Sequence, residues 1–135
     1  MESIQKLTYD DFVLLNDHLS FHPGGLIATF NLLSHTPNIN KEQTILDFGC
    51  GSGITLSFLK RLGFKNLIGY DKNPKAIEIS KSKHSGIDFY NNLDEISEGA
   101  SNIDLILLES VFSFNDNDDL ETLIKSLHEI IKKAK

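Results

Sequence analysis

The stretch "ILDFGCGSG", residues 45–53, places glycine at three alternate positions directly after a short apolar segment. Glycine costs about 0.5–1 kcal/mol in a regular element, so three together indicate positive φ angles or the close approach of a ligand to the backbone. If a helix follows, the loop presents bare N–H groups at the positive end of its dipole, where a phosphate or a carboxylate is stabilised. A turn that only connects a strand to a helix is the alternative.

Two well-defined phosphate-binding loops have a different spacing. A dinucleotide loop reads GxGxxG/A, and its third small residue permits close packing of helix and strand. Counted from Gly49, that position is Ile54. A P-loop ends in Lys followed by Ser or Thr, and no such pair follows the glycines here. The spacing therefore indicates a third kind of loop.

The elements that must position this loop alternate between strands and helices. Short apolar runs predict strands at residues 44–48, 66–71, 87–90 and 103–110. Helical spacing and capping residues predict helices at 8–19, 26–33, 54–62, 74–84 and 118–135. The alternation indicates parallel strands joined by right-handed crossovers, an open, mainly parallel Rossmann-like sheet of the α/β class with helices on both faces. Such sheets bind ligands at the carboxyl ends of their strands, where the glycine loop lies.

Composition limits the classes of partner. With 135 residues, 40% of them hydrophobic, the chain is expected to form one domain, with an N-terminal helical segment over 1–40 and the core over 41–135. The net charge of −6 argues against nucleic-acid binding. Cys50 is the single cysteine, so neither a disulfide framework nor a metal site is expected. No run approaches the roughly 20 apolar residues of a membrane span, and we expect a cytoplasmic protein.

Three motifs together resemble a known family. The glycine loop, "LIGYDKNP" and "IDLILLESVFSFND" are similar to motifs of the class I S-adenosylmethionine-dependent methyltransferases, in which a D/ExGxGxG loop follows the first strand and an acidic residue ends the second. The resemblance runs from about His22 to the end of the sequence and is nearest to the branch that methylates small molecules such as quinone precursors. It implies the strand order 3-2-1-4, S-adenosylmethionine as cofactor and a small-molecule methyl acceptor.

The resemblance also implies roles for the residues of the loop. Gly49, Gly51 and Gly53 would pass beneath the methionine portion of the cofactor, with Cys50 at a small position on the packing side of the loop. Asp47 would fix the loop and reach the methionine amino group, directly or through water. A purely structural Asp47 is the alternative. Nothing near Cys50 in the sequence would activate a thiolate, so no reactive role is expected for it.

Further contacts are implied at the ends of the other strands. Asp71 would accept hydrogen bonds from the ribose hydroxyls, or it would only cap the turn before Pro74. Lys72 would flank the adenine with its aliphatic stem, or it would simply be solvated. Leu108 and Glu109 would contact the methionine amino group. No catalytic residue can be assigned, and Glu109 is the one weak candidate for a general base.

The sequence departs from the family at two contact positions. Many members have an Asp after the third strand that reads adenine, but the stretch here is "YNNLDEI", so Asn91, Asn92 or the backbone at Leu93 must substitute. Upstream, where the related branch can place an Arg on the cofactor carboxylate, the sequence reads "HPGG". The N–H groups of Gly24 and Gly25 would hold that carboxylate instead.

The family's sheet normally has seven strands, and this sequence stops after the helix that follows the fourth. We therefore expect it to lack the C-terminal strands, and with them most of the acceptor pocket. The open edge of the strand "IDLILLE" is expected to pair with a second copy of the chain. Two other functions remain open: a non-catalytic S-adenosylmethionine-binding module, and a nucleotide-dependent oxidoreductase, which Ile54 opposes.

Overall fold

A four-stranded parallel sheet forms the centre of the molecule. The computed structural model describes residues 24–99, 102–109 and 117–133. Its strands are β1 (Thr44–Phe48), β2 (Asn66–Tyr70), β3 (Asp88–Tyr90) and β4 (Leu105–Leu107). They lie in the order β3-β2-β1-β4, and every pair is parallel. This confirms the predicted fold class and strand order.

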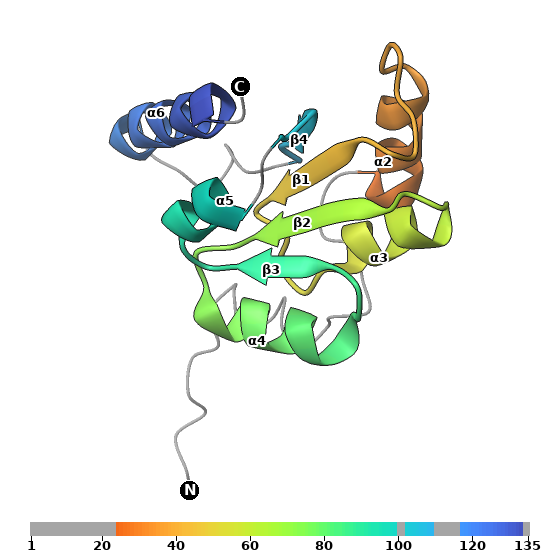
Figure 1. Ribbon diagram of the computed structural model, residues 1–135, viewed down its shortest axis with the longest axis horizontal. Coiled ribbons are helices and arrows are strands. Elements are labelled where there is room, and N and C mark those ends of the chain that lie inside the picture. The colour runs from red at the N-terminus through yellow and green to blue at the C-terminus, as the bar shows by residue number, and fades with distance from the viewer. Residues whose placement is uncertain (1–23, 100–101, 110–116, 134–135) are drawn as a thin grey trace, which may run out of the picture.

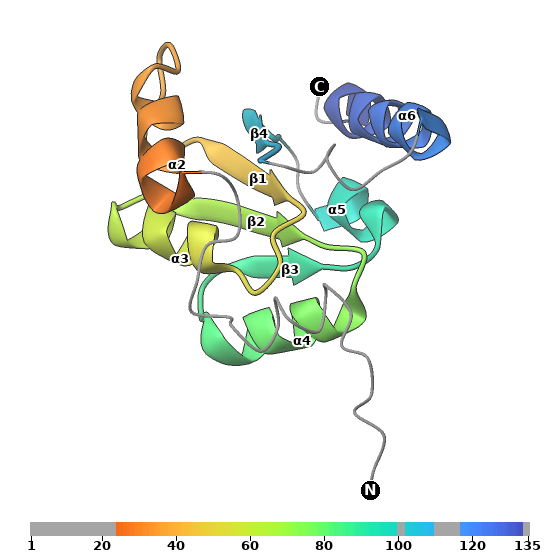
Figure 2. The ribbon, with the colours of Figure 1, turned by 180° about the vertical axis from the view of Figure 1, so that it is seen from behind.

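Helices cover both faces of the sheet (Figures 1 and 2). One apolar cluster joins one face to α2 (Gly25–Ser34), α3 (Ile54–Arg61) and α4 (Pro74–Lys83). A second cluster joins the opposite face to α5 (Leu93–Gly99) and α6 (Asn117–Lys133), which also contact each other. None of the helices in the described part of the chain is both long and apolar enough to cross a membrane.

The apolar run of β1 is buried on both sides because the strand lies inside the sheet. Ile45 belongs to the first cluster and Leu46 to the second, and neither side chain has any exposed surface. An alternating strand with one face in solvent would not carry two consecutive buried residues of this kind. The central position of β1 places the loop that follows it between the ends of β2 and β4.

The structure corrects the predicted secondary structure at two places. Residues 93–99 form α5, which the sequence analysis did not predict, because a short acidic segment that ends in glycine has weak helical signals. Burial of Ile96 in the second cluster stabilises this helix. The fourth strand covers Leu105–Leu107 rather than residues 103–110. The predicted helix at 8–19 lies outside the described residues.

We expect two copies of the chain to associate through the outer edge of β4. β4 ends the strand order, and it pairs only with β1 among the described strands. We expect light scattering to give the mass of a dimer at high concentration, because unpaired N–H and C=O groups at an edge are open to pairing. Hydrogen exchange at the β4 amides should slow as concentration rises. A monomer under all conditions would contradict the prediction.

Candidate functional site

The three glycines of the loop between β1 and α3 adopt backbone conformations that favour glycine. Gly49, Gly51 and Gly53 have φ angles of 88°, 53° and 82°, all in the left-handed region that side chains disfavour. The loop is fastened to the end of β2, because the N–H groups of Gly49 and Cys50 both donate to the carbonyl of Tyr70, at 2.7 and 2.9 Å. The carboxyl ends of the two strands are therefore locked together.

The glycines Gly51 and Gly53 have different surroundings. A Cβ at Gly53 would lie 2.9 Å from the ring atoms of both His84 and Phe89, so this glycine permits close packing under the loop. Apart from its two chain neighbours, no described residue has an atom within 4 Å of a Cβ at Gly51. The backbone at Gly51 thus borders open space, as close approach by a ligand requires.

Asp71 joins the glycine loop to the turn after β2. One carboxylate oxygen accepts a hydrogen bond from the N–H of Gly51 and the other from the N–H of Asn73, both at 2.9 Å. The turn-capping role that the sequence left open is therefore present, together with a loop contact that it did not suggest. Each carboxylate oxygen has more than one lone pair, so it can accept hydrogen bonds from more than one donor.

Asp47 is a buried carboxyl group next to the loop. Burial first, and then the negative charges of Glu109 and Asp71, raise its pKa from 3.8 to about 7. Within the part of the chain that the structure describes, no group donates a hydrogen bond to this carboxylate. Because a buried charge without a partner is costly, the position suits a cation or a donor that comes from outside the chain.

Glu109 follows β4 and is held by α2. The hydroxyl of Thr29, which is fully buried, lies 2.9 and 3.0 Å from the two carboxylate oxygens of Glu109 and can donate to either. Sequence reasoning did not find Thr29. The two residues are 80 positions apart, and a threonine inside a helical apolar stretch gives no signal of its own.

The remaining predicted site residues fall into two groups. Lys72 and Asn92 are exposed, and the Asn92 side chain accepts a hydrogen bond from the N–H of Asp94 at the start of α5. Leu93 and Leu108 pack with the second apolar cluster. Cys50 is buried, and burial together with the nearby carboxylates raises its thiol pKa, so it is a poor nucleophile.

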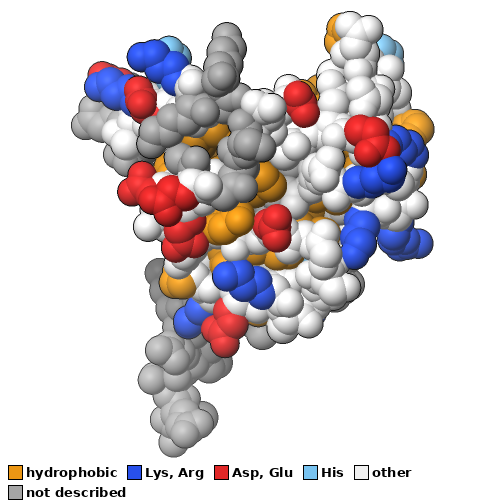
Figure 3. Space-filling model, in the orientation of Figure 1, with side chains coloured by type: hydrophobic (Ala, Val, Ile, Leu, Met, Phe, Trp, Pro, Cys, Tyr) orange, Lys and Arg blue, Asp and Glu red, His pale blue; other side chains and the backbone are white. Residues whose placement is uncertain are grey.

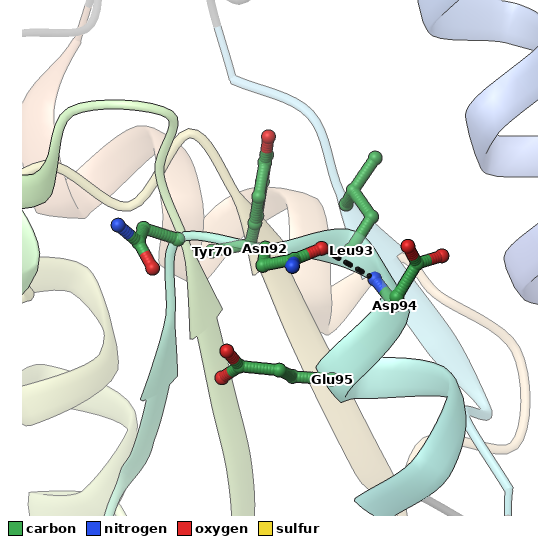
Figure 4. Close-up of a pocket in the computed structure, with 6 residues that line it drawn as sticks. Tyr70, Asn92, Leu93, Asp94 and Glu95 are labelled. Carbon is green, nitrogen blue, oxygen red and sulfur yellow. Dashed lines mark hydrogen bonds between the residues drawn. The ribbon is translucent and has the colours of Figure 1, made fainter.

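An open hollow of about 630 Å³ is lined by Tyr70 of β2 and residues 91–95. Figure 4 shows Tyr70 beside Asn92 and Leu93, and the Asn92 bond to the first turn of α5. Acidic side chains gather over α5, with hydrophobic side chains exposed next to them (Figure 3). The hollow therefore adjoins the carboxyl ends of β2 and β3, where the sequence analysis placed the adenine contact.

Two further side chains hold the loop from α4. The hydroxyl of Ser80 donates to the carbonyl of Gly51, and Nε2 of His84 lies 2.9 Å from the carbonyl of Ser52. Upstream of the site, α2 starts at Gly25 with Gly24 as its N-cap, one residue before the predicted start. Both of these glycines have positive φ, so this helix also opens on a backbone that favours glycine.

A family model and two similar solved structures all correspond to methyltransferases. Residues 19–134 match a family described as a methyltransferase domain. Among solved structures, the fold is similar to a TehB-like SAM-dependent methyltransferase from Corynebacterium glutamicum (TM-score 0.57, 23% identity, 78% of this chain and 54% of that one). It is also similar to the plantazolicin methyltransferase BpumL, solved with SAH (TM-score 0.56, 23% identity, covering 82% of this chain and 40% of that one).

Curated relatives match a shorter region. The ribosomal protein L11 methyltransferase of Tolumonas auensis is 40% identical over 70 residues, which cover 51% of this chain and 24% of the relative. The corresponding protein of Cupriavidus pinatubonensis is 43% identical over 44 residues, 33% of this chain and 15% of the relative. The matched segment is thus about a quarter or less of these relatives' length.

Proposed function

Because the chain belongs to the methyltransferase domain family, we propose that it binds S-adenosylmethionine at the carboxyl ends of β1, β2 and β4 and supports methyl transfer to a small nucleophile. The observation that carries the proposal is the buried Asp47 carboxylate, which lacks a donor within the described residues and lies next to a glycine loop with open space at Gly51.

The residues present fit this cofactor. S-adenosylmethionine carries a sulfonium and an ammonium group, and the site has three acidic side chains close enough for two of them to raise the pKa of the third. A cation would relieve the repulsion among Asp47, Glu109 and Asp71, since an opposite charge stabilises the ionised carboxylates. Gly51 has room for a ligand where any other residue would place a side chain.

Each part of the proposed site has a separate task. Asp47 and Glu109 would hold the methionine ammonium group, and Asp71 would accept from the ribose hydroxyls. The adenine would lie in the hollow by Asn92 and Leu93, with the exposed Lys72 alongside. When bound, S-adenosylmethionine would supply a methyl group from its sulfonium sulfur to a nucleophile, and the sulfur would leave as the neutral thioether of S-adenosylhomocysteine. The chain's contribution is mainly alignment, which can supply about 7–11 kcal/mol.

Glu109 is the proposed acceptor of a proton where the nucleophile must lose one. Its carboxylate accepts a hydrogen bond from the Thr29 hydroxyl. This bond fixes the orientation of the carboxylate, which can still accept a proton. A panel of small acceptors and the ribosomal protein L11 would be tested with labelled S-adenosylmethionine. Transfer to a small acceptor supports the proposal, whereas transfer to L11 alone would overturn the acceptor class. Binding without any transfer would favour a non-catalytic module.

Ligand binding provides the first test. At 100 times its Kd, S-adenosylmethionine or S-adenosylhomocysteine should stabilise the chain by about 2.7 kcal/mol, which raises Tm on the order of 10 °C. NAD at the same concentration should not change Tm, because Ile54 stands where a dinucleotide loop needs a small residue. No shift with millimolar S-adenosylhomocysteine would count against the proposed cofactor, and a shift with NAD alone would favour an oxidoreductase.

The Asp71→Asn variant tests the ribose contact. It removes one charged acceptor, so we expect the Kd for S-adenosylhomocysteine to rise about 10- to 150-fold, as for a hydrogen bond of about 1.5–3 kcal/mol. Calorimetry would measure the change. Asp104→Asn is a matched control, because Asp104 also accepts a backbone N–H, that of Thr44, but at the amino ends of the strands. Unchanged affinity in Asp71→Asn would rule out the assigned contact.

A further inference from the structure

The loop that would bind the cofactor contains three glycines, so its own side chains do little to fix its shape. Glycine populates positive and negative φ about equally, and a peptide next to glycine can rotate at little steric cost. The loop must therefore be held by groups from elsewhere in the fold. From one side, Asp71 accepts the N–H of Gly51. From the other side, α4 provides two donors.

The first donor is Ser80, in the second turn of α4. Its side chain has no exposed surface, and Oγ lies 2.9 Å from the carbonyl oxygen of Gly51. The Cys50 thiol is a much weaker donor to the same oxygen, at 3.8 Å. Because a trans peptide is planar, with C=O and N–H on opposite sides, fixing the carbonyl of Gly51 also fixes the direction of the Ser52 N–H.

The second donor is His84, which caps α4. Nε2 lies 2.9 Å from the carbonyl oxygen of Ser52, and a carbonyl only accepts, so Nε2 carries the proton. The ring also packs against Gly53, where a Cβ would approach Cδ2 to 2.9 Å. The His84 N–H donates to the carbonyl of Ser80, so the two donors are linked through the backbone of one helix end.

We propose that Ser80 and His84 are positioning residues for the cofactor loop, which set the peptide planes after Gly51 and Ser52. This inference rests on the proposed function. Neither side chain touches the open space at Gly51, so both act through the loop and not on the ligand. Together with Asp71, they hold both polar groups of Gly51, its N–H and its C=O.

The test uses pairs of variants that separate positioning from folding. His84→Phe keeps an aromatic ring against Phe89 and Gly53 but removes the donor, whereas His84→Gln keeps an N–H near the position of Nε2. Ser80→Ala removes the hydroxyl, and Ser82→Ala is its control, because the exposed Ser82 hydroxyl bonds only within α4, to the carbonyl of Ile79. Denaturant unfolding measures the stability of each variant and shows whether it is fully folded in the absence of denaturant.

Two readouts are measured on the folded variants. Hydrogen exchange of the free protein should be about tenfold faster at the amides of residues 51–53 in Ser80→Ala and His84→Phe, and unchanged in Ser82→Ala and His84→Gln. Calorimetry with S-adenosylhomocysteine should show a Kd about tenfold higher for the first two variants only. If loop exchange and Kd match the parent's while unfolding shows lost stability, both residues are merely structural and the inference is wrong.

The exchange measurement does not depend on the ligand. If the parent does not bind S-adenosylhomocysteine, the proposed function fails, and loop exchange still shows whether α4 holds the loop. If the parent binds and all four variants bind equally well, the proposed function stands and the positioning role is overturned. If Ser80→Ala does not fold, Ser80→Thr is measured in its place, and if His84→Phe does not fold, His84→Gln is used. Both replacements keep a hydrogen-bond donor, so loop exchange should match the parent's. Accelerated loop exchange in either would contradict the positioning role.

Discussion

Gly51→Val should bind neither S-adenosylmethionine nor S-adenosylhomocysteine at millimolar concentration. Gly51 has a φ of 53°, which a β-branched residue adopts only with strain, and its Cβ would enter the open space where we place the ligand. The backbone term alone is roughly 1–2 kcal/mol. Binding should be lost altogether, because the added side chain and the ligand compete for one volume. Calorimetry on the folded variant measures the loss.

Gly86→Val is the matched control for backbone strain. Gly86 also has a positive φ, 72°, and lies before β3 at the amino end of the sheet. Among the described residues, its Cβ would meet only the flexible end of the Lys60 side chain. We expect both variants to lose similar stability, but only Gly51→Val to lose binding. Parent-like affinity in Gly51→Val would show that the glycines serve only as a turn between strand and helix.

Asp47→Asn should gain stability at pH 8 and lose affinity for the cofactor. Burial and the carboxylates of Glu109 and Asp71 raise the pKa of Asp47 to about 7 in the folded state, against 3.8 ordinarily. The folded state thus holds the proton more tightly than the unfolded state. The contribution of Asp47 to the free energy of unfolding is then largest below pH 4 and falls as pH rises to about 7. The loss on the alkaline side is on the order of 4 kcal/mol.

The substitution removes this pH dependence, so the variant and the parent should differ little at pH 4 and most at pH 8. Urea unfolding at the two pH values measures the difference. Asp88→Asn, which removes an exposed carboxylate from β3, should keep the parent's pH profile. A parent whose stability does not fall between pH 4 and 8 relative to Asp47→Asn would contradict the assigned cause.

Cofactor affinity should follow the opposite trend. Only ionised Asp47 attracts an ammonium group, so the parent's affinity for S-adenosylmethionine should rise as pH increases from 5 to 8. Asp47→Asn should bind at least tenfold more weakly at pH 8, since a hydrogen bond to a charged group contributes about 1.5–3 kcal/mol. Equal affinity of parent and variant would make Asp47 structural. The group that weakens the free protein is thus the group we expect the ligand to need.

The strands and most of the helices were predictable from the sequence because the signals involved are local, whereas the strand order was implied by the resemblance to a known family. The run of residues 44–48 is apolar at Ile45, Leu46 and Phe48, as suits a strand buried on both sides, and the structure has β1 over those residues. The Asn73 cap and Pro74 likewise mark the start of α4, and the Asn73 side chain accepts the N–H of Lys75. The three glycines also indicated either positive φ angles or close approach of a ligand, and the structure shows that all three φ angles are positive.

Other features depended on the tertiary structure because they arise between segments that only the fold brings together. The Thr29 bond to Glu109 spans 80 residues, and the Ser80 and His84 bonds to the loop span 29 and 32. The raised pKa of Asp47 depends first on burial and then on charges that follow β4 and β2 in the chain, and no local pattern encodes either. α5 is similar: its acidic sequence is a weak helix former, and the burial of Ile96 stabilises it. Local sequence determined the strands and all the described helices except α5, whereas packing decided which polar groups meet at their ends, because those contacts depend on distances between elements.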